Sequence, residues 1–239
     1  MATGALSALL RIVCEFLLPP LCDSCRSRLP SHLRWLCPAC SARLRDLEVD
    51  DPVLRQSRLL LTSSGNISLF VALYRFEADG PLRTIIHGVK YQGLTRAGIR
   101  LGRVLGRRVR DECPHDIDAI VPVPLHPTRY RERGYNQAAC IARGLARVLR
   151  VPVDEGILVR ARSTVSQTSL GREERRANVR GAFSVPSSRR SAAEGRRFLI
   201  VDDVVTTGST LQECAAALCS EGARRCVACA VAVAADGNV

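Results

Sequence analysis

A chain of 239 residues and 26.1 kDa can form one well-packed core with a small appendage, but not two large domains. Aromatic residues make up only 4% of the chain, which argues against a nucleic-acid-binding sheet built on stacked aromatic rings. The formal net charge of +12 favours an anionic partner, although a basic surface that only maintains solubility would have the same charge.

The first 20 residues are apolar but do not have the pattern of a signal peptide or a membrane span. They lack a basic start, contain Arg11 and Glu15, and are too short for the roughly 20 apolar residues that cross a bilayer. We expect a short amphipathic helix that ends at Pro19 and Pro20, with no membrane anchor. The odd number of cysteines, 11, argues against a secreted disulfide scaffold and favours a reducing cytoplasm.

Two CxxC pairs follow, separated by eleven residues. Pairs with this spacing can bring four thiolates to one tetrahedral zinc ion. Few apolar residues surround them, so metal binding would supply much of the folding energy of this segment. We therefore expect a structural Zn²⁺ site whose ligands are Cys22, Cys25, Cys37 and Cys40. His32 in the loop is an alternative ligand, and two unrelated redox or packing pairs are the alternative interpretation.

The polar stretch 45–52 is the candidate domain boundary. We expect an N-terminal helix and a four-cysteine zinc ribbon in residues 1–50, and a second domain in residues 59–239. Alternating apolar residues from Ile67 predict a strand, and Pro81 is placed to begin a helix at its first turn. A further helix is expected around 94–110.

Buried strands and helices alternate through the rest of the chain. Continuous apolar runs at 117–124, 198–203 and 227–234 are typical of strands covered on both faces in a parallel sheet. Helical spacing is found at 134–149 and 209–222, and the polar stretch 184–197 is typical of a surface connection. This alternation predicts an α/β fold with a mostly parallel sheet flanked by helices.

The segment 198–210, FLIVDDVVTTGST, combines an apolar strand, two carboxylates and a hydroxyl-rich turn before a helix. Ligands collect at the carboxyl ends of parallel strands, and helix N-termini bind phosphate. The turn predicted to hold a phosphate consists of Thr206, Thr207, Gly208, Ser209 and Thr210. Asp202 and Asp203 suit the hydroxyls of an attached ribose, or a Mg²⁺ ion. The alternative is that these Asp and Thr side chains only cap the next helix.

Basic residues and a stiff loop are expected beside this turn. The loop after the 117–124 strand, which carries the residues Val121, Pro122, Val123 and Pro124, should lie next to it. Three arginines follow in the chain, at Arg129, Arg131 and Arg133. The arginine-rich segment 160–180 has the composition of a flap that closes over a ligand and excludes water, and Lys90 is a further basic candidate.

The 198–210 segment resembles the signature of type I phosphoribosyltransferases. The strings KYQG (90–93), VPVPLHPTRYRERGYNQA (121–138) and LVRARSTVSQTSLGREERRANVRGAF (158–183) extend the resemblance to the ComF family of competence-associated phosphoribosyltransferase-like proteins. The residues that match the family pattern in these strings are Arg133, Gly134, Asn136, Gln137, Arg160, Arg162, Thr164, Gln167, Leu170, Arg175 and Asn178. This resemblance spans nearly the whole chain, and such proteins often carry an N-terminal zinc ribbon.

The resemblance implies a type I phosphoribosyltransferase-like fold that binds 5-phosphoribosyl-1-pyrophosphate with Mg²⁺. It implies that Asp202 and Asp203 contact the ribose hydroxyls and that the 206–210 turn holds the 5′-phosphate. Further ligand contacts are expected from the 121–124 loop and from three basic residues, Lys90, Arg133 and Arg162. The chain would then transfer the phosphoribosyl group to an unidentified acceptor and release pyrophosphate.

Two other functions stay open. One is a nucleic-acid-binding module in DNA uptake, with single-stranded DNA or the competence machinery as partner; it is favoured by the zinc ribbon and the net charge. The other is a sensor that binds phosphoribosyl pyrophosphate without catalysis. A homodimer is also compatible with the sequence.

A third CxxC pair, Cys226 and Cys229, lies within a predicted strand. Residues three apart on a strand point to opposite faces, so these thiols are expected to pack in the core and not to share a metal. The remaining cysteines have no partner spacing and are expected to be buried apolar residues: Cys14, Cys113, Cys140, Cys214 and Cys219.

Overall fold

The computed structural model describes residues 19–30, 32–33, 35–160 and 180–234. The predicted N-terminal helix and the arginine-rich segment that contains Arg162 therefore lie outside the described residues, apart from their ends. Among the helices within these ranges, none combines the length and the apolar character that crossing a membrane requires.

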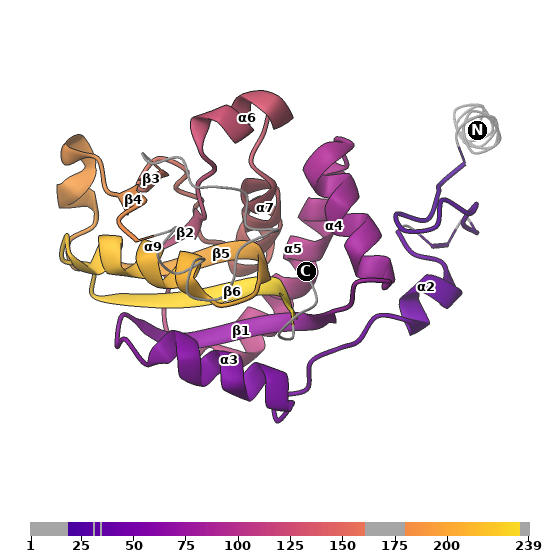
Figure 1. The fold of residues 1–239 in the computed structure, drawn as a ribbon, viewed down its shortest axis with the longest axis horizontal. Coiled ribbons are helices and arrows are strands. Elements are labelled where there is room, and N and C mark those ends of the chain that lie inside the picture. Colours follow the sequence, from indigo (N-terminus) through magenta and orange to yellow (C-terminus); the bar gives the residue numbers. More distant parts are fainter. Residues whose placement is uncertain (1–18, 31, 34, 161–179, 235–239) are drawn as a thin grey trace, which may run out of the picture.

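A four-stranded parallel sheet forms the centre of the molecule (Figure 1). Its strands lie in the order β1 (Ile67–Phe76), β6 (Arg225–Ala234), β5 (Arg197–Val205) and β2 (Ala119–Pro122). Each of the three neighbouring pairs is parallel. The predicted α/β fold with a mostly parallel sheet is confirmed, and the three apolar runs at 117–124, 198–203 and 227–234 all contribute strands.

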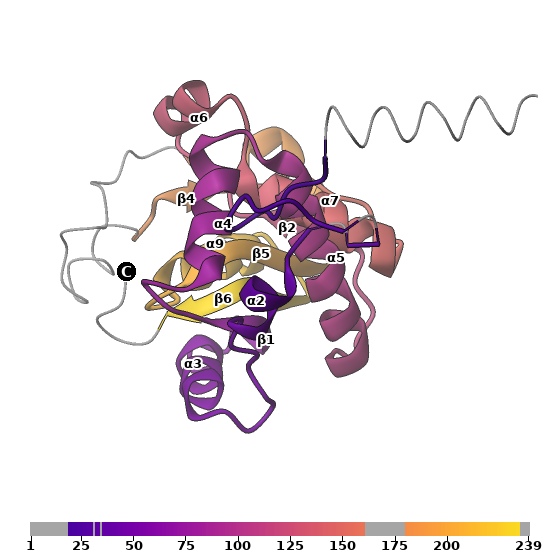
Figure 2. The same cartoon turned by 90° about the vertical axis from the view of Figure 1, so that its right-hand side faces the viewer.

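Helices cover both faces of the sheet (Figure 2). On one face lie α4 (Pro81–Tyr91), α5 (Thr95–Glu112) and α7 (Gln137–Leu149), and on the other lie α3 (Pro52–Thr62) and α9 (Ser209–Cys219). Alternate residues of each central strand supply the two cores. Thus Cys229 of β6 packs on the α4, α5 and α7 side while Cys226 packs on the α3 and α9 side, which confirms that this CxxC pair faces opposite ways.

Helices α5 and α7 cross in close contact at two glycines. A Cβ atom added to Gly102 would overlap the carbonyl oxygen of Ile141, and one added to Gly144 would overlap the carbonyl oxygen of Ile99. The backbones therefore approach each other directly at this crossing, which anchors α7 to the helix layer. Because α7 follows β2 in the chain, this packing also fixes the segment between them.

Four short or unpredicted helices and a small strand pair complete the described part of the chain. Helix α3 begins at Pro52 after Asp51, whose carboxylate accepts a hydrogen bond from the N–H of Val53 at 2.8 Å. The other three are α2 (Pro38–Ala42), α6 (Pro127–Arg133) and the 3₁₀ helix η2 (Ser187–Ala192). A two-stranded antiparallel pair, β3 (Val159–Arg160) and β4 (Phe183–Ser184), lies beside the main sheet.

The division into ranges 1–50 and 59–239 stays a prediction. Residues 45–47 run along the free edge of β1, with the N–H of Leu47 bonded to the carbonyl of Leu73 at 2.8 Å. Leu54 and Leu61 of α3 are buried in the core on that side of the sheet.

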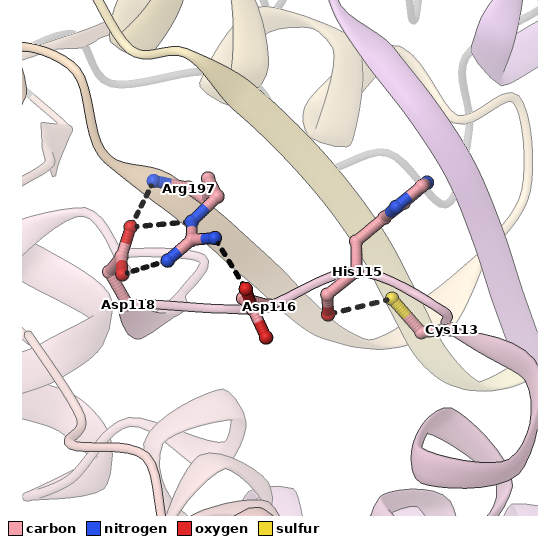
Figure 3. A network of polar contacts seen from close by, with 5 residues as sticks. All are labelled: Cys113, His115, Asp116, Asp118 and Arg197. Carbon is pink, nitrogen blue, oxygen red and sulfur yellow. Dashed lines mark hydrogen bonds and ion pairs between the residues drawn. The ribbon is translucent and has the colours of Figure 1, made fainter.

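An arginine ties the amino ends of β2 and β5 together (Figure 3). The guanidinium of Arg197 donates to both carboxylate oxygens of Asp118, at 3.0 and 2.7 Å, and to Asp116 at 2.9 Å. The N–H of Arg197 also donates to Asp118 at 2.8 Å. These hydrogen bonds from Arg197 lower the pKa of Asp118 to about 2. This pair lies at the opposite end of β5 from Asp202 and Asp203.

Candidate functional site

The candidate site lies where β5 extends beyond β2. Pairing between these strands ends at Pro122 and Val201, and the next N–H along, that of Val123, donates to the carbonyl of Val201 at 2.9 Å. On its other side β5 stays paired with β6 as far as Val205. Asp202 and Asp203 therefore follow directly after the point at which the neighbouring strand leaves the sheet. Of the four residues predicted to form a loop here, Val121 and Pro122 are instead the last residues of β2, and only Val123 and Pro124 follow the strand.

Lys90 and Asp203 form a buried ion pair. The Nζ atom of Lys90, in the last turn of α4, lies 2.5 Å from Oδ2 of Asp203, whose side chain is only 8% exposed. Burial is the largest single influence and raises the pKa of Asp203, but the charge of Lys90 together with hydrogen bonds from Asp202, Lys90 and the backbone of Val204 lowers this pKa below its usual value. Burial likewise disfavours the charged amine, yet Asp203 raises the pKa of Lys90. Lys90 is the only lysine in the sequence.

Asp202 behaves differently from its neighbour. Burial, and after it the negative charge of Asp203, raises the pKa of Asp202 well above its usual value. Its Oδ1 atom accepts a hydrogen bond from the N–H of Asp203 at 2.8 Å. Of the two acids, only Asp203 pairs with a cation among the described residues, so the pKa values of the two neighbouring acids move in opposite directions.

The TTGST turn connects β5 to α9 through a residue with positive φ. Gly208 has φ of +73° and is the N-cap of α9, and no side chain makes a capping hydrogen bond from that position. A Cβ atom at Gly208 would lie 2.6 Å from Cδ2 of Leu61. The hydroxyls of Thr207 and Ser209 lie 2.8 Å apart. Neither Asp202 nor Asp203 caps the helix, so the capping alternative does not describe the two acids.

The segment that joins α6 to α7 contacts both α4 and the loop after β2. Arg133 donates from Nη1 to Gln137 at 2.8 Å and from Nη2 to the hydroxyl of Tyr91 at 3.3 Å. Tyr135 donates its hydroxyl to the carbonyl of Val89. Asn136 follows in the same segment. Its Nδ2 donates to the carbonyl of Val123 at 2.9 Å.

The predicted site residues are thus brought together in part. Asp202, Asp203, the 206–210 turn, the 121–124 loop and Lys90 share the carboxyl end of the sheet. Arg133 is hydrogen-bonded to Tyr91, the residue that follows Lys90. Arg162 lies outside the described residues. Sequence reasoning missed Tyr135, for which the only signal was its position inside the RGYNQ string.

The four N-terminal cysteines form one cluster. The Sγ atoms of Cys22, Cys25, Cys37 and Cys40 all lie within 4.8 Å of one another. The Sγ atoms of Cys25 and Cys37 are 3.7 Å apart, close to the roughly 3.8 Å expected for two thiolates about 2.3 Å from a tetrahedral zinc ion. Backbone N–H groups of Cys37 and Cys40 point at the sulfurs of Cys22 and Cys37, both at 3.4 Å. The donor set fits zinc, and His32 is not part of it.

This cluster packs onto the sheet domain beside α4 (Figure 1). The residues of the N-terminal segment that join the core on the α4 and α5 side are Cys22, Leu29, Leu36 and Cys40. Arg100 of α5 donates to Asp23 at 2.8 Å, although burial still raises the pKa of that aspartate. The four-cysteine segment is therefore attached to α5, the helix that follows α4 in the chain.

Comparisons with known proteins agree with this architecture. The family model described as "Phosphoribosyl transferase domain" matches residues 136–238. The chain is 39% identical over 137 residues to "Competence protein F" of Haemophilus influenzae, which covers 56% of this chain and 59% of that protein. It is 35% identical over 150 residues to "DNA utilization protein YhgH" of Escherichia coli K12, covering 60% and 63% respectively.

A third relative aligns over more of the chain. The similarity to "Competence protein ComFC" of Bacillus subtilis is 28% identity over 222 residues, which is 87% of this chain and 82% of that protein. The chain spans about three fifths of the length of the Haemophilus and Escherichia relatives. These similarities confirm the family resemblance and the phosphoribosyltransferase-like fold that the motifs indicate.

Proposed function

We propose that this chain, a competence protein of the ComF type with a phosphoribosyltransferase domain and an N-terminal four-cysteine cluster, binds 5-phosphoribosyl-1-pyrophosphate at the carboxyl end of β5. The observation that carries the proposal is the adjacency of two acids and a glycine-capped helix N-terminus on one strand end. The acids suit ribose hydroxyls, which are hydrogen-bond donors, and the helix end suits phosphate. A ligand that joins both groups is a sugar phosphate.

In this proposal the 206–210 turn holds the 5′-phosphate. Gly208 gives the turn its positive φ and leaves room for Leu61 of α3, and the hydroxyls of Thr207 and Ser209 already lie together on that turn. Hydrogen bonds to a charged phosphate contribute about 1.5–3 kcal/mol each, so a few of them are enough to anchor the ligand. Asp203 and Asp202 then face the ribose, and Lys90 balances the negative charge of the site.

The pyrophosphate group is proposed to sit against the 121–124 loop. Mg²⁺, bound with the ligand, would neutralise part of the charge on pyrophosphate as it leaves. Among the described residues, Lys90 is the cation that pairs with the acidic pair. Burial lowers the pKa of Arg160, and the positive charge of Arg129 lowers it further, so Arg129 lies close to Arg160. The reaction that fits is transfer of the phosphoribosyl group to an acceptor not yet identified.

The experiment for this proposal separates binding from catalysis. Calorimetry with Mg²⁺ measures phosphoribosyl pyrophosphate binding to the wild type and to a Gly208→Val variant, in which the side chain overlaps Leu61 and the positive φ is strained, so that the turn must change shape; circular dichroism checks that the variant is folded. Binding by wild type alone supports the site, and no wild-type binding refutes it. A pyrophosphate-release screen over nucleobases and amines then distinguishes an enzyme from a sensor.

A second candidate function is binding of single-stranded DNA in DNA uptake. It is supported by the net charge of +12, the four-cysteine cluster and the printed name of one relative, "DNA utilization protein". We also propose a cytoplasmic location, because the ten cysteines of the described residues are all free.

A further inference from the structure

Tyr135 holds the turn of α4 that carries Lys90. The N–H groups of Gln92 and Leu94 both donate to the carbonyl of Gly88, at 3.0 and 3.2 Å. The next carbonyl, that of Val89, is one of the last four of the helix, which have no helical partner, and it accepts the hydroxyl of Tyr135 instead. The residue after Val89 is Lys90. Tyr135 therefore fixes the backbone from which the ammonium group reaches Asp203.

Asn136 holds the second element of the site. Its side chain is buried, with 9% of the residue exposed, and it makes two hydrogen bonds at once. Oδ1 accepts the N–H of Ala138 at 2.9 Å and so caps α7, while Nδ2 donates to the carbonyl of Val123 at 2.9 Å. Val123 in turn donates its N–H to Val201, directly before Asp202. Asn136 thus fixes the loop after β2 against β5.

Arg133 completes the same arrangement from the end of α6. Its Nη1 atom donates to Gln137 and its Nη2 atom to Tyr91, with the guanidinium carbon 4.9 Å from the centre of the Tyr91 ring. Both terminal nitrogens are engaged within the protein. Tyr91 follows Lys90, so the residues on both sides of Lys90 are held by one short segment.

We propose that Arg133, Tyr135 and Asn136 are positioning residues of the phosphoribosyl site, which act through the Lys90 turn and the Val123 loop and do not touch the ligand. The inference rests on the proposed function for the meaning of the site, and it assigns Arg133 a role different from the ligand contact implied by the family resemblance. It explains why the contacts from this one segment end on elements next to Asp202 and Asp203.

The first test reads Lys90 itself, without any ligand. Because Lys90 is the only lysine, the acetyl-lysine formed with a limiting amount of acetic anhydride reports on Lys90 alone, and the α-amino group is the internal reference. The Tyr135→Phe variant removes only the hydroxyl bonded to Val89. We expect its Lys90 to react at least threefold faster than in the wild type. The matched control is Tyr130→Phe on α6, where the tyrosine is 51% exposed, and it should react like the wild type.

The second test separates capping from positioning at Asn136. An Asn136→Ser variant keeps an oxygen that can cap α7 but loses the donor to Val123, and it introduces no charge at this buried position. We expect the thermal unfolding midpoint to change little, while the affinity for phosphoribosyl pyrophosphate with Mg²⁺ falls about tenfold. Equal affinity in this variant and the wild type would remove Asn136 from the proposal.

The third test distinguishes a positioning role of Arg133 from a ligand contact. Lysine keeps the charge but cannot bond to Gln137 and Tyr91 together. We expect Arg133→Lys and Arg133→Gln to lose affinity to the same extent. If Arg133→Lys binds like the wild type while Arg133→Gln does not, Arg133 is a ligand contact and the assignment is wrong.

The two proposals fail in different ways. If the wild type binds no phosphoribosyl pyrophosphate, the proposed function is refuted, and the acylation rates still decide whether Tyr135 holds the Lys90 turn. If the wild type binds the ligand but Tyr135→Phe matches Tyr130→Phe in both acylation rate and affinity, the site stands and the positioning role is refuted.

Discussion

Removing Lys90 should destabilise the protein in a way that depends strongly on pH. In a Lys90→Met variant the stem of the side chain is kept, but Asp203, only 8% exposed, loses the charge that balances it. Burial raises the pKa of this aspartate, and Lys90 is the largest influence that offsets burial, so without Lys90 the pKa should rise above its usual value. Breaking a buried ion pair from one side costs about 3–5 kcal/mol.

Protonation of Asp203 sets an upper limit to the free energy that the Lys90→Met variant can lose. Placing a proton on a carboxyl with an ordinary pKa of about 3.9 costs about 5 kcal/mol at pH 7.5 and about 1.5 kcal/mol at pH 5.0. The unfolded chain has the ordinary pKa, so the penalty from a raised folded pKa is present at neutral pH and disappears as the pH falls. The variant should therefore lose about 3–5 kcal/mol at pH 7.5 and at most about 1.5 kcal/mol at pH 5.0.

The assay is urea unfolding of Lys90→Met, Asp203→Asn and the double variant at both pH values. Asp203→Asn should cost less than Lys90→Met, because the side chain of Lys90 is 26% exposed and its amine can turn toward water. The double variant should be more stable than Lys90→Met alone, since no buried charge remains. A loss below about 1 kcal/mol for Lys90→Met at pH 7.5, or an equal loss at both pH values, would refute the buried-pair argument.

Four further outcomes are expected. Purified protein should contain one zinc per chain, and a Cys37→Ser, Cys40→Ser variant should lose it in metal analysis; undiminished zinc would remove the assignment. Binding to DNA should be weak and fall steeply between low and physiological salt in a filter or anisotropy assay, and salt-insensitive binding argues against phosphate contacts. Thr207→Val with Thr210→Val should weaken binding of phosphoribosyl pyrophosphate and of ribose 5-phosphate at least tenfold by calorimetry, and unchanged affinity contradicts the phosphate turn. Asp118→Asn should cost about 1 kcal/mol at neutral pH, and because the folded pKa is about 2 the difference from wild type should vanish as the pH falls from about 4 through 2; a constant difference contradicts the Arg197 pairing.

Strands and long helices were predictable from local pattern. The strand runs are continuous and apolar because both faces of the sheet are covered, and period-two alternation places Cys226 and Cys229 on opposite faces. The predicted helix at 134–149 is α7, which begins later than expected, at Gln137. Gly134, at φ of +76°, is the C-cap of α6, and Asn136 is the N-cap of α7, so the first residues of the predicted range belong to the connection between two helices.

Helix α6 was missed for a related reason. None of its residues is buried, so its sequence carries no apolar stripe from which a helix could be recognised. Helix α3 was hidden because its first residues, Asp51 and Pro52, fall in the polar stretch taken as a boundary, although Asp followed by Pro is a helix-start signal.

The parts of the candidate site also differ in how far they could be predicted from the sequence. The acids and the TTGST turn are contiguous in sequence, so a single strand-turn-helix pattern brings them together. The pair between Lys90 and Asp203 joins segments far apart in the chain, and no local pattern indicates which cation meets which acid. Tyr135 is harder still, because its contact is with a backbone carbonyl and leaves no complementary residue type in the sequence.

The charge of the proposed phosphoribosyl site suits a lysine at position 90, in a chain whose other strongly basic residues are all arginine. An acid that binds ribose must be dry and ionised, yet the ligand it binds carries several negative charges of its own. A buried arginine would hold Asp203 through a planar two-point contact, which is difficult to release. The compact ammonium of Lys90 makes one contact with Asp203, at 2.5 Å, and in the proposed site it would turn toward the ligand once ribose hydroxyls bound the carboxylate. On this reasoning Lys90→Arg should preserve the fold and weaken ligand binding, and calorimetry on that variant with unfolding as the control decides it: affinity equal to wild type would show that the geometry of the cation does not matter.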